Sequence, residues 1–274
     1  MEAKGAIGVF DSGYGGLTIL EHFQSLLPGY DYLYLGDNAR TPYGSRSYEI
    51  VYEFTRESVA RLFSMGCELV ILACNTASAK ALRTIQQQDL PGWGAGKRVL
   101  GIIRPTAEAI GGLTRGGHVG LLATEGTIQS ESYPMEIGKL YPHLHVSGQA
   151  CPMWVPLVEN GEANSPGADF FVKQYIDRLM AQDPDIDTVV LACTHYPLLA
   201  HKIRKYLPAN VQILSQGPLI AESLRQYLLH HPEMDERLSR GGTTRFLTTE
   251  NVSRFSKSAS IFLKGNIEAE RVTL

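Results

Sequence analysis

Cysteine is scarce in this 274-residue chain, which carries four: Cys67, Cys74, Cys151 and Cys193. No two of them form a Cys-X-X-Cys pair, so the sequence favours neither a disulfide framework nor a zinc ribbon. We therefore expect reduced thiols and no bound metal. Because a buried intracellular cysteine is commonly inert, position in the fold must decide which of the four are reactive.

The chain also lacks an excess of charge and a long hydrophobic run. Its formal net charge is −3, so no broad positive field would recruit nucleic acid or an anionic membrane. The apolar stretch 6–10 is too short for the hydrophobic core of a signal peptide or for a membrane span. We expect a cytoplasmic protein that acts on a small molecule and binds neither nucleic acid nor membrane.

Short apolar runs rich in Val, Ile and Leu recur along the chain, and each ends in a polar or glycine-rich segment. Such runs predict buried strands, and the segments between them carry apolar residues at the spacing of helices. The predicted strands are 6–10, 32–35, 69–73, 119–122 and 188–192. The predicted helices are 48–64, 77–88, 167–181 and 198–207. This alternation predicts an α/β fold with parallel sheets covered on both faces.

The two halves of the chain resemble each other. Val70-Ile-Leu-Ala-Cys74-Asn-Thr76 matches Val189-Val-Leu-Ala-Cys193-Thr-His195. Ile7-Gly-Val-Phe-Asp11-Ser-Gly13 aligns with Val119-Gly-Leu-Leu-Ala123-Thr-Glu125 at a similar spacing, and a weaker third match pairs the segments that begin at 32 and 145. We therefore predict two pseudo-symmetric lobes, each a mostly parallel sheet flanked by helices, with the active site in the cleft between them.

A glycine-rich stretch at 92–96 predicts the boundary between the lobes. We expect residues 1–98 in the first lobe and 99–210 in the second. The remaining segment, 211–274, contains a strand-like run, a helix and an amphipathic stretch, which is too little for a third core. It is expected to return and complete the first lobe.

Cys74 and Cys193 each follow a predicted strand and precede a predicted helix. Ligands of parallel sheets bind outside the carboxyl ends of the strands, so both thiols are expected at a ligand-facing edge. Asn75 or Thr76 is expected to cap the first helix and Thr194 the second. A helix N-terminus or a neighbouring base then shifts a thiol towards the thiolate.

Two thiols from matching positions of two similar lobes favour a reaction with two equivalent faces, and inversion at a carbon is such a reaction. One thiolate removes the α proton of an amino acid while the opposite thiol returns one. The carbanion needs donors around the α-carboxylate. Loops at the same sheet edge offer backbone N–H groups, hydroxyls and amides: 11–16, 42–45, 75–76, 124–127 and 194–195.

Three further residues are candidates for assisting the thiols. Asp11 ends a strand of the first lobe and either relays a proton to Cys74, holds an ammonium group or simply caps a turn. His195 lies two residues beyond Cys193 and could support that thiolate. Glu159 precedes a glycine turn, where a solvated carboxylate is the commoner case. The remaining cysteines, at 67 and 151, have no counterpart in the repeat and are interpreted as structural.

Four motifs together resemble the glutamate racemase family: Asp11-Ser-Gly-Tyr-Gly-Gly-Leu17, Gly36-Asp-Asn-Ala-Arg-Thr-Pro-Tyr-Gly44, Ala73-Cys-Asn-Thr-Ala-Ser-Ala79 and Leu191-Ala-Cys-Thr-His-Tyr-Pro-Leu198. Two more support it, Thr124-Glu-Gly-Thr-Ile-Gln-Ser130 and Cys151-Pro-Met-Trp-Val-Pro-Leu-Val-Glu159. The resemblance covers nearly the whole chain and implies a racemase of the aspartate/glutamate fold that needs neither pyridoxal phosphate nor metal.

The resemblance also implies roles for individual residues. Cys74 would act on D-glutamate with support from Asp11, and Cys193 on L-glutamate with support from His195 and Glu159. The implied substrate contacts are Asp11, Ser12, Tyr43, Gly44, Asn75, Thr76, Thr124, Thr127, Thr194 and His195. The product would supply peptidoglycan synthesis, and family members commonly form homodimers. Residues 214–217 depart from an Asp-Ser pair that many relatives carry, in a segment expected to lie away from the catalytic motifs.

Three alternatives stay open at this point. A related racemase could act on aspartate or a hydantoin with the same two thiols. A solute-binding protein also has two similar lobes around a cleft, although it has no use for paired cysteines at matching strand ends. The glycines at 13–16 suggest a nucleotide-binding fold, but their spacing is not Gly-X-Gly-X-X-Gly.

Overall fold

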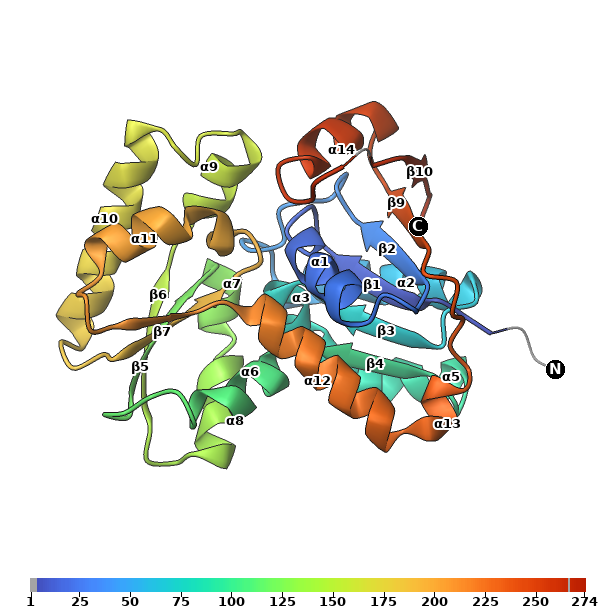
Figure 1. Ribbon diagram of the computed structural model, residues 1–274, viewed down its shortest axis with the longest axis horizontal. Helices are drawn as coiled ribbons and strands as arrows, with labels where there is room; N and C mark the ends of the chain where they lie inside the picture. The colour runs from blue at the N-terminus through green and yellow to red at the C-terminus, as the bar shows by residue number, and fades with distance from the viewer. Residues whose placement is uncertain (1–3, 266) are drawn as a thin grey trace.

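Two α/β lobes lie side by side in the computed structural model, which describes residues 4–265 and 267–274 (Figure 1). The first lobe has a six-stranded sheet in the order β10-β9-β2-β1-β3-β4, and the second a four-stranded sheet in the order β6-β5-β7-β8. Every neighbouring pair is parallel. The strands are β1 (Ile7–Asp11), β2 (Tyr32–Gly36), β3 (Leu69–Leu72), β4 (Arg98–Gly101), β5 (His118–Ala123), β6 (His145–Ala150), β7 (Thr188–Ala192), β8 (Gln212–Leu214), β9 (Thr244–Thr248) and β10 (Ala269–Arg271).

Helices cover both faces of each sheet, as predicted. They are α1 (Leu17–Leu26), α2 (Tyr48–Ser64), α3 (Asn75–Lys80), α4 (Leu82–Thr84), α5 (Leu90–Trp93), α6 (Ile103–Ile110), α7 (Glu125–Gln129), α8 (Ser132–Leu140), α9 (Trp154–Glu159), α10 (Pro166–Gln182), α11 (Ala200–Tyr206), α12 (Gln216–His230), α13 (Pro232–Asp235) and α14 (Val252–Ala259). Among the described residues, no helix combines the length and the apolar character that crossing a bilayer requires.

Alternating side chains of the strands fill two cores on opposite faces of the first sheet. Ile7 and Val9 of β1 pack with the apolar faces of α1 and α12, whereas Phe10 packs on the other side with α2. All three side chains are fully buried. Each such burial contributes roughly 1.5–3 kcal/mol to folding. Ser47 fixes the start of α2, because its side chain accepts a hydrogen bond from the backbone N–H of Ile50.

The strand orders confirm the internal repeat. The order β2-β1-β3-β4 in the first sheet has the same sequence of connections as β6-β5-β7-β8 in the second. All three sequence matches, including the weaker one, therefore join equivalent strands: β1 with β5, β2 with β6, and β3 with β7. Cys74 and Cys193 consequently follow equivalent strands and lie at equivalent sheet edges.

The C-terminal segment returns to the first lobe, where β9 pairs with β2 and extends the sheet (Figure 1). Two details differ from the sequence interpretation. The strand-like run after residue 211 forms β8 and pairs with β7 of the second lobe, and β4 extends to Gly101 in the first. The chain thus crosses between lobes after Gly101 and after Leu214, a few residues later than the predicted boundaries at 98 and 210.

Candidate active site

A cavity of about 100 Å³ lies between the lobes and contains both repeated cysteines. It is formed where β1 and β3 of one lobe and β5 and β7 of the other present their carboxyl ends. Its lining residues are Asp11, Ser12, Thr41, Pro42, Tyr43, Gly44, Ser45, Cys74, Asn75, Thr76, Thr124, Glu125, Cys151, Pro152, Val155, Pro156, Cys193, Thr194 and His195. The size suits a small amino acid, and the charged and polar side chains among these residues suit a zwitterion.

Cys74 occupies the N-cap position of α3, where its sulfur accepts a hydrogen bond from the backbone N–H of Ala77 at 3.4 Å. The Oγ atom of Ser12 lies 3.3 Å from the same sulfur. The expectation that Asn75 or Thr76 caps this helix is wrong, because the cysteine itself takes that position. Burial, together with the nearby carboxylate of Asp11, raises the pKa of Cys74 to about 12, so this sulfur is a thiol at neutral pH.

Cys193 belongs to a relay of three side chains. Its sulfur lies 3.8 Å from Nδ1 of His195, and Nε2 of the same imidazole lies 2.9 Å from Oε1 of Glu159. Burial lowers the pKa of His195, but the contacts with Cys193 and Glu159 outweigh it and raise that pKa to about 10. The imidazole is therefore an imidazolium at neutral pH and stabilises a thiolate beside it.

The segment after Cys193 begins with a short 3-10 turn, Tyr196–Leu199, and α11 starts only at Ala200. His195 occupies the N-cap position and makes no side-chain capping bond there, so the predicted capping by Thr194 is wrong. Cys193 thus lies beside an imidazolium rather than at the N-terminus of a long helix. The two cysteines sit at equivalent positions but in different electrostatic environments.

Asp11 closes the turn after β1, where its Oδ2 atom accepts a hydrogen bond from the backbone N–H of Gly13 at 2.9 Å. This is the turn-capping contact that the sequence left as one alternative. The carboxyl group also lines the cavity, so the capping contact does not exclude a functional role. Burial raises its pKa despite the opposing charge of His195, which brings this carboxyl closer to the range in which it can exchange a proton.

Gly15 lets the first lobe approach the relay of the second. A Cβ atom at this position would lie 2.2 Å from Oγ1 of Thr194 and 2.5 Å from Nδ1 of His195. Next to it, the hydroxyl of Thr18 donates a hydrogen bond to the carbonyl oxygen of Thr194 at 3.1 Å. Any side chain larger than hydrogen at residue 15 would push the imidazole away from Cys193.

Three threonine hydroxyls form a cluster that spans both lobes. Oγ1 of Thr76 lies 2.9 Å from that of Thr124 and 3.4 Å from that of Thr127, and the latter two are 3.0 Å apart. Thr76 and Thr124 line the cavity, whereas Thr127, also expected to contact the substrate, lies outside the lining and contacts both of them. The carbonyl oxygen of Gly44 accepts a hydrogen bond from the N–H of Gly126 at 2.7 Å, which brings the predicted 42–45 loop to the same wall.

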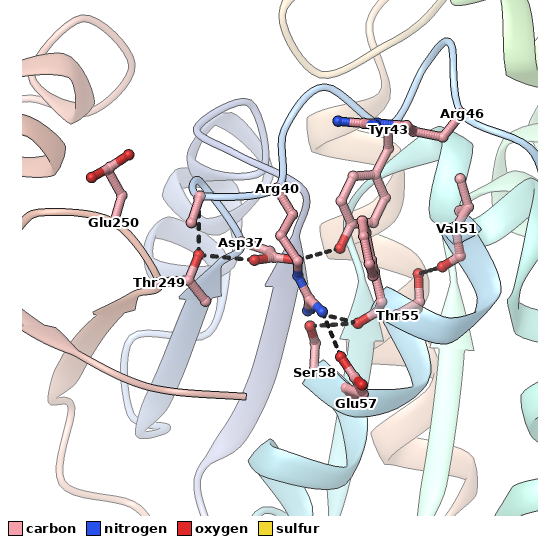
Figure 2. A network of polar contacts seen from close by, with 12 residues as sticks. Asp37, Arg40, Tyr43, Arg46, Val51, Thr55, Glu57, Ser58, Thr249 and Glu250 are labelled. Atoms are coloured by element: carbon pink, nitrogen blue, oxygen red, sulfur yellow. Dashed lines mark hydrogen bonds and ion pairs between the residues drawn. The ribbon is translucent and has the colours of Figure 1, made fainter.

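Tyr43 enters the cavity on a loop that a buried carboxylate holds in place (Figure 2). Asp37 is fully buried and accepts hydrogen bonds from the Tyr43 hydroxyl at 2.5 Å, from Nε of Arg40 at 2.6 Å and from the Thr249 hydroxyl at 2.8 Å. Arg40 is also paired with Glu57. The network joins the cavity loop to α2 and to the end of β9.

Several contributors escaped the sequence interpretation. Cys151, interpreted as structural, is buried in the cavity wall. Glu159, by contrast, is absent from the lining and reaches the cavity through His195. The segment 214–217 is not remote from the catalytic motifs, because the buried amide of Gln216 accepts a hydrogen bond from Nδ2 of Asn75 at 2.7 Å. No local pattern reveals such a contact, which joins residues 141 positions apart.

A larger groove of about 1220 Å³ also lies between the lobes, but neither cysteine lines it. The smaller cavity is the better candidate because it gathers two thiols, an imidazolium and a buried carboxyl. A possible group of metal ligands, His118, Asp183 and Asp185, lies at the start of β5 and therefore at the opposite sheet edge. There Nδ1 of His118 is paired with Asp183 at 2.8 Å.

Known proteins resemble the chain over nearly its full length. The Asp/Glu/Hydantoin racemase family matches residues 17–224. A glutamate racemase of Ruegeria sp. is 41% identical, over 97% of this chain and 99% of its own. The crystal structure of a glutamate racemase isoform from Bacillus anthracis is 36% identical with a TM-score of 0.89, covering 98% of each chain.

Other solved structures extend this likeness. A glutamate racemase from Francisella tularensis in complex with D-glutamate is 30% identical, has a TM-score of 0.87 and covers 98% of each chain. An aspartate racemase from Picrophilus torridus, at 17% identity and a TM-score of 0.54, shares the fold alone. On its sequence, its two-lobed architecture and its paired cysteines, the chain belongs to the Asp/Glu/hydantoin racemase family of isomerases.

Proposed function

We propose that this protein is a glutamate racemase that interconverts L- and D-glutamate without a cofactor, using Cys74 and Cys193 as opposed acid and base. The observation that carries the proposal is the presence of both thiols in one small cavity, each following an equivalent strand of a repeated lobe. The glutamate racemases that the chain resembles over nearly its whole length support glutamate as the substrate.

The different environments of the thiols support a direction for each. Cys193, which lies 3.8 Å from Nδ1 of the imidazolium of His195, is assigned the role of base, and Cys74, with its raised pKa, that of acid. In the conversion of L-glutamate, the Cys193 thiolate takes the α proton and becomes a thiol. Cys74 then gives its proton to the opposite face of the carbanion and becomes a thiolate. Two bonds to hydrogen break and two form, and the product is D-glutamate.

The enzyme that has released D-glutamate carries its thiolate at Cys74 and is ready for the reverse reaction. To convert a second L-glutamate instead, it must regain a proton at Cys74 and lose one at Cys193. Asp11 and His195 are suited to these exchanges because each has a raised pKa and lines the cavity beside its own lobe's cysteine. Glu159 acts through His195 by holding its charge.

Hydrogen-bond donors around the cavity would hold the substrate while its α proton moves. The threonine cluster, the Asn75 amide and the backbone of the Ser12 turn are suited to the carboxylates. Further substrate contacts are proposed for Tyr43, Gly44, Thr194 and His195. Because only a hydrogen changes sides at the α carbon, the carboxylates can keep the same partners throughout the reaction.

A direct test is to incubate the reduced protein with L-glutamate in D2O without added cofactor. Optical rotation should fall to zero, and α-proton NMR should show that the first D-glutamate formed carries deuterium while the remaining L-glutamate does not. That pattern is specific to two different bases. Aspartate, assayed in parallel, distinguishes the related racemases. Absence of exchange with either amino acid, in a folded protein, would instead support a binding protein.

Serine variants then test the roles of the thiols. Cys74→Ser and Cys193→Ser should each reduce racemisation by at least about 100-fold, since general acid–base catalysis contributes roughly 10²–10⁴. Circular dichroism should show an unchanged fold. Full activity in either variant would rule out the opposed-thiol mechanism.

D-glutamate production is proposed to serve peptidoglycan synthesis in the cytoplasm. The resemblance further suggests a homodimer, and sedimentation velocity would measure the oligomeric state.

A further inference from the structure

Four buried side chains form a closed hydrogen-bond network against the wall of the cavity. Nδ2 of Asn75 donates to Oε1 of Gln216 at 2.7 Å, and the Tyr133 hydroxyl donates to Oδ1 of Asn75 at 2.6 Å. Nε2 of Gln216 donates to the Tyr133 oxygen at 2.7 Å and to Oγ1 of Thr106 at 2.8 Å. Asn75, Gln216 and Tyr133 form a ring of three hydrogen bonds, in which each side chain donates to the next in that order.

A backbone carbonyl sets the direction of every bond in this network. The hydroxyl of Thr106 donates to the carbonyl oxygen of Ile102 at 2.7 Å, so its oxygen is left to accept. The amide nitrogen of Gln216 must therefore face Thr106, which turns its oxygen towards Asn75. The nitrogen of Asn75 must then face Gln216, and its oxygen faces Tyr133. No other assignment of the two amides satisfies all these groups.

The network leaves Asn75 with one defined free donor. Its Nδ2 atom carries two hydrogens, one of which is held by Gln216. Among the described residues, no acceptor is bonded to the second, and Asn75 lines the cavity with both cysteines. Without the ring, rotation of the amide by half a turn would present a carbonyl oxygen to an anionic substrate instead of an N–H.

The ring also joins the two lobes beneath the cavity. Asn75 lies in α3 of the first lobe, Tyr133 lies in α8 of the second, and Gln216 begins α12, which crosses from one to the other (Figure 1). All three are at least 97% buried, with exposures of 3%, 0% and 2% respectively. A polar ring so deeply buried costs free energy unless its groups are hydrogen-bonded, and here the one donor left over is the second N–H of Asn75.

We propose that Gln216 and Tyr133 are positioning residues that orient the Asn75 amide so that its free N–H meets a carboxylate of glutamate. The inference rests on the proposed racemase function and concerns residues that do not touch the substrate. The carboxamide of Gln216 supplies both the acceptor for Asn75 and the donor to Tyr133.

Tyr133→Phe tests the proposal with the smallest change. The amide of Asn75 loses its orientation, so KM for both enantiomers should rise roughly 3- to 10-fold, while kcat stays within about twofold. Tyr32→Phe is the matched control, because its buried hydroxyl donates to backbone carbonyls of α1 and its C-terminus, at Phe23 and Leu27, away from the cavity. This control should lower the melting temperature and leave KM unchanged.

A double-mutant cycle separates positioning from simple stability. In an Asn75→Ala background, Tyr133→Phe should add no further increase in KM, because the group that it orients is gone. Gln216→Met, which keeps the approximate shape but removes the acceptor of Asn75 and both donors, should raise KM as Tyr133→Phe does. Unchanged KM in the single variants, or KM effects that multiply in the double variant, would overturn the proposal. Failure of the unmodified protein to racemise glutamate would instead refute the proposed function.

Discussion

Replacing Glu159 by glutamine removes one charge from the Cys193 relay and preserves its shape. The carboxylate lies 2.9 Å from the imidazole, its side chain is 20% exposed and that of His195 is 6% exposed. A hydrogen bond to a charged group contributes roughly 1.5–3 kcal/mol, and about 1.4 kcal/mol corresponds to one pH unit of pKa. In Glu159→Gln the pKa of His195 should therefore fall from about 10 to roughly 8–9.

The rate should fall with it. A weaker imidazolium stabilises the Cys193 thiolate less, and a loss of that size corresponds to about a 10- to 100-fold decrease in kcat/KM. The decrease must be equal for both enantiomers, because their equilibrium constant is one. The two enantiomers should differ instead in the primary isotope effect on kcat/KM. This effect should increase more for α-deuterated L-glutamate than for α-deuterated D-glutamate, because proton transfer to Cys193 becomes slower.

The pH profile gives an independent readout. His195 is protonated below its pKa, so activity that needs the imidazolium disappears as pH rises through that value. Lowering the pKa should move the basic limb of kcat/KM towards neutral pH by roughly one to two units. Glu162→Gln, at an exposed position three residues away, is the charge-matched control and should leave the limb in place. An unmoved limb in Glu159→Gln would refute the relay.

Three further substitutions test the supporting structure. Gly15→Ala places a methyl group against Thr194 and His195 and should cost about 1–3 kcal/mol of unfolding free energy together with most racemase activity, measured by denaturation and polarimetry. Asp37→Asn weakens the bond that holds the Tyr43 hydroxyl and should raise KM for glutamate several-fold; an unchanged KM would exclude a role for this network in binding. Cys67→Ala should lower the melting temperature slightly and leave kcat/KM within about twofold, whereas a large loss would mean that this thiol is not merely structural.

The sequence predicted the lobes well because their signals are local. A strand such as Leu69–Leu72 is an unbroken apolar run, and its counterpart Thr188–Ala192 repeats it, so both the strands and their equivalence could be inferred. The edges of the lobes were misplaced because β8 is short and only partly buried, which gives it little apolar pattern. The motif around Cys193 indicated His195, but not that the imidazolium replaces a helix N-terminus.

Contacts between segments far apart in the sequence could not be predicted from local sequence patterns. Gln216 reads as an ordinary polar residue at the start of a helix, and its burial follows only from the crossing of α12 between the lobes. Cys151 likewise has no repeat partner, yet the turn after β6 brings it to the cavity wall. In both cases tertiary packing, and not local propensity, determines where the side chain lies.

The two crossings between the lobes lie next to each other in space. Gln216, just after the second crossing, is bonded to Thr106, which is itself bonded to Ile102 at the first. The second lobe is thus an insertion whose two ends lie close together. Such insertions are tolerated because they leave only a short gap in the chain of the domain that receives them. Both junctions of the second lobe with the first are therefore made at a single point of the fold.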